Sequence, residues 1–107
     1  MRIWNYLGVR LQLPSTIAEW ELLQGPGREA GKAARAMTSA LQKVLRREAR
    51  NVEGGGPLSF NRFQNLWMEQ LDLLDLAYPD TGIRDTEPRE NGLEVIRTFI
   101  DTRWGFA

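Results

Sequence analysis

The longest regular pattern of apolar positions lies between Arg28 and Asn51, in a segment without proline. Its apolar residues recur mostly at steps of three and four residues. They are Ala30, Ala33, Ala34, Met37, Leu41, Val44 and Leu45. Such steps place one apolar stripe along an α-helix, because the helix repeats every 3.6 residues. The pattern predicts an amphipathic helix of about six turns.

A second helical pattern follows the glycine-rich turn at residues 54–57. Ser59 stands where a capping residue is expected, and Pro79 ends the segment because proline disfavours helix at the residue before it. The apolar positions are Phe60, Phe63, Leu66, Trp67, Leu71, Leu74 and Tyr78. Two long helices joined by so short a connection predict an antiparallel helical hairpin.

Two shorter helices are predicted from capping patterns. Thr16 and Glu19 have capping-box spacing and predict the start of the first of these helices, and Gly25 is expected to end it. Asn91 with Glu94 is expected to cap a last helix. The last helix would bury Leu93, Ile96, Phe99 and Ile100.

Residues 1–13 fit two patterns. Val9, Leu11 and Leu13 alternate as in a strand, whereas Trp4, Leu7 and Leu11 share one face of a helix. We favour the helix. The fold class expected is therefore all-α, a single domain over residues 1–107 with four or five helices built on a central antiparallel helical hairpin. The predicted core consists of Trp20, Met37, Leu41, Val44, Phe63, Trp67, Leu71, Leu74, Ile96 and Phe99.

Composition limits the kinds of functional site that the chain can form. Hydrophobic residues make up 42% of the 107 residues and charged residues 26%, which is typical of one folded domain. Histidine and cysteine are both absent. Their absence excludes disulfides, histidine and thiolate metal ligands, thiol nucleophiles and the serine-histidine triad. We therefore expect no enzyme activity, no cofactor and no bound metal. The lack of cysteine also fits a cytoplasmic location. No apolar run is long enough to span a bilayer, so we expect no membrane partner.

Two weaker sequence signals for ligand binding lack the surrounding features that such sites require. Residues 25–30 match the pattern G-x-G-x-x-A, but no strand is predicted before them, as a dinucleotide site would require. The carboxylates from Asp72 to Glu90 do not have the spacing of a calcium-binding loop.

The distribution of charge is more informative than its total. The chain has 14 basic and 14 acidic residues, yet residues 28–50 hold seven basic and two acidic ones. In one interpretation, Glu69, Asp72 and Asp75 of the second helix match this basic run inside the fold. In the other, a basic stripe binds the phosphates of a nucleic acid, because arginine forks fit phosphate oxygens. The stripe consists of Arg35, Lys43, Arg46, Arg47 and Arg50.

Four tryptophans are many for 107 residues. Trp20 and Trp67 lie on apolar helix faces and are expected in the core. Trp4, Trp104 and Phe106 lie near the chain ends, where they either fold back or anchor a partner. The function expected is a non-enzymatic protein–protein interaction or assembly module, a small helical subunit or adaptor that binds another protein or itself. The alternative is a nucleic-acid-contacting subunit that uses the basic stripe.

Overall fold

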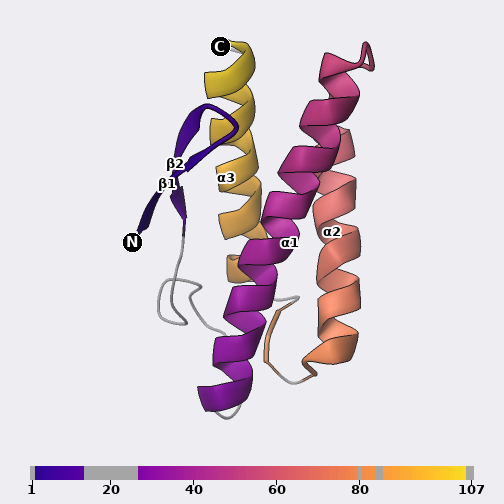
Figure 1. Cartoon of the computed structure of the whole chain (residues 1–107). Helices are drawn as coiled ribbons and strands as arrows, with labels where there is room; N and C mark the ends of the chain where they lie inside the picture. The colour runs from indigo at the N-terminus through magenta and orange to yellow at the C-terminus, as the bar shows by residue number, and fades with distance from the viewer. Residues whose placement is uncertain (1, 14–26, 80, 84–85, 106–107) are drawn as a thin grey trace.

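A computed structural model describes residues 2–13, 27–79, 81–83 and 86–105. These residues form a β-hairpin followed by three helices, so the chain is mostly helical, as the all-α prediction requires (Figure 1). The elements are β1 (Arg2–Tyr6), β2 (Val9–Leu13), α1 (Gly27–Glu53), α2 (Phe60–Ala77) and α3 (Thr86–Trp104). The described residues thus contain three helices rather than four or five. The short helix expected after Thr16, together with Trp20, lies outside the described residues.

Residues 2–13 correct the sequence analysis, because they form two strands and not a helix. β1 pairs with β2 in antiparallel register, with Tyr6 opposite Val9. The turn consists of Leu7 and Gly8, whose φ angles are 51° and 79°. Two successive positive φ angles define a type I′ turn, the turn whose twist suits a two-residue hairpin loop. The strand alternation was therefore the informative pattern, and the shared helical face was coincidental.

α1 and α2 confirm the antiparallel helical hairpin. The turn between them is closed by backbone hydrogen bonds from Gly54 N to Arg50 O at 2.9 Å and from Gly56 N to Asn51 O at 2.8 Å. Ser59 holds the expected N-cap position, but its side chain makes no capping hydrogen bond. α2 ends at Ala77, before the proline, as predicted.

α3 begins at Thr86, so the prediction that Asn91 caps it was wrong. Asn91 and Gly92 lie inside the helix. The glycine is needed there for a packing reason: a Cβ on Gly92 would lie 2.2 Å from Cε2 of Trp67. The Trp67 indole Nε1 donates a hydrogen bond to the Arg89 carbonyl at 3.1 Å, which fixes the ring against the α3 backbone.

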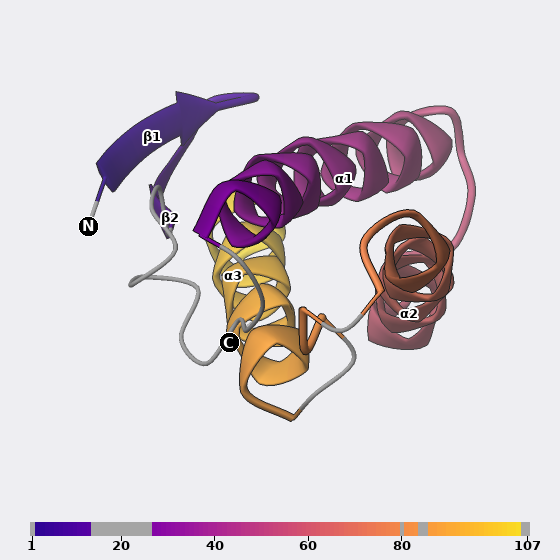
Figure 2. The ribbon, with the colours of Figure 1, turned by 90° about the horizontal axis from the view of Figure 1, so that it is seen from below.

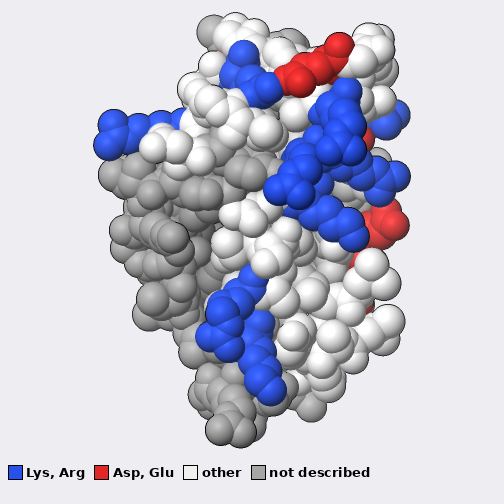
Figure 3. Space-filling model, viewed as in Figure 1, with Lys and Arg blue, Asp and Glu red and all other residues white. Residues whose placement is uncertain are grey.

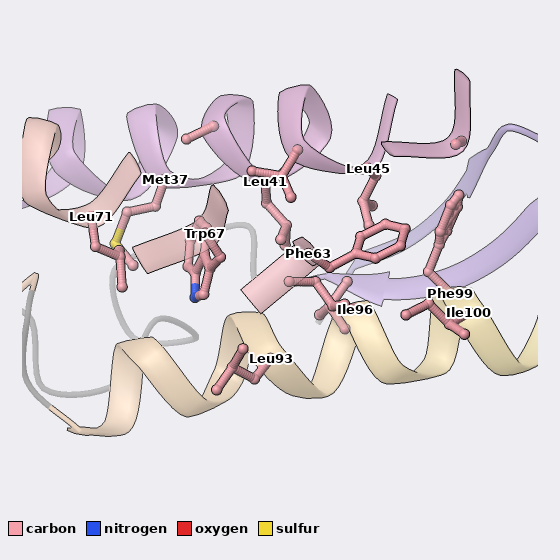
Figure 4. Packing of buried hydrophobic residues seen from close by; sticks show 14 of the residues in the cluster. Met37, Leu41, Leu45, Phe63, Trp67, Leu71, Leu93, Ile96, Phe99 and Ile100 are labelled. Atoms are coloured by element: carbon pink, nitrogen blue, oxygen red, sulfur yellow. The ribbon is translucent and has the colours of Figure 1, made fainter. Parts of the chain in front are cut away.

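The core lies between the three helices, and the hairpin packs on α3 through β2 (Figure 2). Met37, Leu41 and Leu45 of α1 face α2 and α3 (Figure 4). Of the ten core residues predicted, eight are buried and Leu74 is half-buried. The eight are Met37, Leu41, Val44, Phe63, Trp67, Leu71, Ile96 and Phe99. The hairpin adds Val9, which is 2% exposed.

Candidate functional site

The exposed side of α1 carries a row of cations that we call the basic face. It consists of Lys32, Arg35, Lys43, Arg46, Arg47 and Arg50, all exposed. At 100° per residue, all except Arg47 fall within an arc of about 80°, and the row is about 27 Å long. Lysine and arginine side chains gather over α1 on the side shown in Figure 3. Four of the five residues of the predicted stripe therefore share one arc, Arg47 lies beside it, and Lys32 extends the row.

Glu48 of the same helix points away from the basic face. Glu48 is the one acidic residue between Lys32 and Arg50, and it is only 3% exposed. Its Oε2 lies 3.2 Å from Nε of Arg62 on α2 and accepts a hydrogen bond from Asn51 at 3.4 Å. A buried carboxylate requires such partners, because burial without them is costly. Glu48 is therefore neutralised from α2, away from the basic face.

Glu53, at the end of α1, is paired in a similar way by α3. Arg103 Nε donates a hydrogen bond to Glu53 Oε1 at 3.0 Å, and its terminal nitrogen NH2 makes a second contact with the same oxygen. The other terminal nitrogen, NH1, donates to the carbonyl of Leu7 at the hairpin turn. Arg103 thus links three elements: the end of α1, α3 and the tip of the hairpin.

The acidic residues of α2 that were expected to match the basic run occupy different environments. Glu69 and Asp72 are exposed, and Asp75 is half-buried. On α1, Glu48 pairs with Arg62 of α2 and Glu53 pairs with Arg103 of α3. Matching of the basic run by α2 stays a prediction.

The predicted protein-binding residues are not brought together by the described part of the chain. Trp104 is half-buried, with its ring centroid 5.6 Å from that of Phe99 and 6.2 Å from that of Phe63. The Arg103 guanidinium lies 5.7 Å from the Trp104 ring. Trp104 therefore folds back on the core. Phe106 and the side chain of Trp4 lie outside the described residues.

The sequence analysis missed two exposed leucines on α2. Leu73 is 56% exposed and Leu76 is 80% exposed. Rotation by 100° per residue places them about 160° and 140° from buried Leu71, on the opposite side of the helix. That rotation was the available signal, because residues 71–76 hold four leucines that cannot share one face.

Other kinds of site find no support in the described residues. They contain no cluster of three or more potential metal ligands, and none of their helices is long and apolar enough to cross a membrane. Comparisons with family models, with curated proteins and with solved structures give no match. A function for this chain must therefore be argued from its own residues.

Proposed function

We propose that this chain is a non-enzymatic helical binding module and that the basic face of α1 contacts the phosphates of a nucleic acid. The observation that carries the proposal is the exposure of six cations between Lys32 and Arg50 of α1. Glu48, the one carboxylate in that stretch, is buried and lies against Arg62 of α2. Such a face presents one sign of charge along its length.

Phosphate contact, rather than reading of bases, fits the composition of this face. Arginine, which binds phosphate oxygens through two parallel hydrogen bonds, supplies four of its six cations. Residues 28–50 contain no aromatic side chain on which a base could stack. We therefore expect binding with little sequence preference, dominated by release of counterions.

The test is fluorescence anisotropy with labelled single- and double-stranded RNA and DNA at low and physiological salt. Arg46→Glu with Arg50→Glu should weaken binding at least tenfold and make the salt dependence shallower by about two in log–log slope. Arg10→Glu with Arg97→Glu is the matched control, because it changes net charge equally at exposed positions outside α1.

Two outcomes would contradict the proposal. The first is no binding at low salt. The second is equal weakening by both double variants, which would show that only the net charge of the chain matters.

Protein binding at the chain ends is the second candidate. The observation that favours it is the Trp104 ring, which packs on Phe63 and Phe99 yet stays partly exposed. Phe106→Ala should then abolish binding of the partner protein, and the wild-type complex should persist at 0.5 M salt because apolar burial is not screened. A complex that salt dissolves and Phe106→Ala leaves intact would refute this candidate.

A further inference from the structure

The basic face of α1 is divided into two groups of cations with a neutral interval between them. The first group is Lys32 and Arg35. The second group consists of Lys43, Arg46, Arg47 and Arg50. Figure 3 shows two groups of blue side chains over α1, with uncoloured surface between them. The mean positions of the two groups, 33.5 and 46.5, are about 20 Å apart along the helix.

The distance between the two groups is fixed by the core. The side of α1 opposite the basic face is buried from Ala33 to Ala49, which covers most of the length of both groups. Met37 and Leu41 pack into the core beneath the neutral interval (Figure 4). α1 lies across α2 and α3 (Figure 2). A helix packed over this length does not bend to bring the two groups together, so the best ligand presents negative charge at both places.

We propose that the basic face binds a nucleic-acid duplex, with each group of cations on a different phosphate backbone and the neutral interval over the groove between them. This inference rests on the proposed function and specifies its ligand. The major groove of B-form DNA is about 12 Å wide between the surfaces of the two backbones, so phosphorus atoms on its two sides are about 18 Å apart. An RNA duplex presents its two backbones across a wide, shallow minor groove. Both grooves place phosphates within reach of two groups about 20 Å apart.

The neutral interval itself favours a duplex. Within the arc that the cations share, Ser39 is the one residue between Arg35 and Lys43, and it is exposed. Its side chain is short and uncharged, so α1 approaches the groove without a cation at the place where a duplex has no phosphate.

A single strand lacks this match. A duplex holds its two rows of phosphates apart before binding, so the second group of cations meets phosphates that are already in place once the first group is bound. A single strand must be ordered to reach both groups, which costs conformational entropy. Stacking of bases on aromatic rings would offset that cost, and residues 28–50 contain no aromatic side chain.

The test exchanges two exposed residues of α1. Lys32→Ser with Ser39→Lys moves one cation from the first group into the neutral interval and leaves composition and net charge unchanged. Fluorescence anisotropy at low salt compares short labelled DNA and RNA duplexes with single strands of the same length. The wild type should bind a duplex at least fivefold more tightly than a single strand. The exchange should weaken binding of the preferred duplex at least threefold and make its log–log salt slope shallower by about one, with no effect on single strands.

Lys32→Ser alone is the control, because it removes the cation without replacing it. It should weaken binding of duplexes and of single strands, and addition of Ser39→Lys should restore only the single strands. Circular dichroism should show both variants folded. Restoration of duplex binding would overturn this inference, because only the number of cations would then matter, and so would equal binding of duplex and single strand by the wild type. Both results would leave the proposed function standing, whereas no binding of any nucleic acid would overturn both.

Discussion

α3 is held at its two ends by different kinds of contact. Near its start, the fully buried Trp67 ring lies directly on Gly92 and donates a hydrogen bond to the Arg89 carbonyl. Near its end, half-buried Trp104 meets Phe63 and Phe99 through tilted and edge-on rings, and Arg103 reaches across the surface. The start of α3 is fixed by steric fit and its end by contacts that can adjust.

The difference determines how each end responds to mutation. A close-packed interior has no room for an added atom, so a single methyl group there forces the backbone or the ring to move. Substitution of an exposed ion pair or a half-buried ring lowers stability less, because water replaces part of the interaction that is removed. A substitution at Gly92, near the start of α3, should therefore have a larger effect than substitutions of Trp104 or Arg103 at its end.

The largest effect is expected for Gly92→Ala. In an open helix this change would stabilise the protein by about 1 kcal/mol, because alanine is the better helix former. Here the new methyl group would meet three atoms of the Trp67 ring at 2.2 to 2.4 Å. We expect a net loss of about 3 kcal/mol in the free energy of unfolding, measured by urea denaturation.

A double mutant separates the steric cause from a general weakness of the helix. In a Trp67→Leu background the clash is removed, so adding Gly92→Ala should be neutral or stabilising. Thr98→Ala, at an exposed position of α3, is the control and should change stability by a few tenths of a kcal/mol. If Gly92→Ala destabilises equally in both backgrounds, the contact with Trp67 is not the reason for the glycine.

A smaller effect is expected for Trp104→Leu at the other end of α3. The substitution keeps an apolar side chain but removes the ring contacts to Phe63 and Phe99. Aromatic pairs contribute about 0.5–1.5 kcal/mol beyond area burial, so the loss should be about 1–2 kcal/mol. Urea denaturation measures it, and an unchanged midpoint would show that the ring does not pack on the core.

The helical hairpin was predictable because its determinants are local. The three- and four-residue steps in α1 and α2 and the glycines at residues 54–57 specify two helices and a turn without reference to distant residues. The same periodicity placed the basic residues on one exposed face. Six of the eight predicted core residues that are buried lie on these two helices.

The rest depends on contacts between distant residues. Asn91 and Gly92 resemble a helix start, but the glycine serves the close approach of Trp67 from α2. The hairpin was missed because Leu7 adopts a φ of 51°, which leucine rarely does, so no turn signal preceded Gly8. The steps of three and four residues place Glu48 on the apolar face of α1, but its pairing with Arg62 joins residues of two helices and has no local signal.

The smallest effect on stability is expected for Arg103→Met, which keeps the aliphatic stem and removes the guanidinium. Because the Glu53 partner is exposed, the ion pair contributes only about 0.2–1 kcal/mol, and 0.5 M salt should reduce this further. The informative measurement is local. Hydrogen exchange of the β1 and β2 amides should become faster, because Arg103 also donates to the Leu7 carbonyl. Glu53→Gln removes the ion pair but leaves that donor, so it should affect hairpin exchange less. Arg97→Met, whose guanidinium lies over Phe60, should not affect it. Equal exchange in Arg103→Met and the wild type would show that packing of Val9 on α3 alone holds the hairpin.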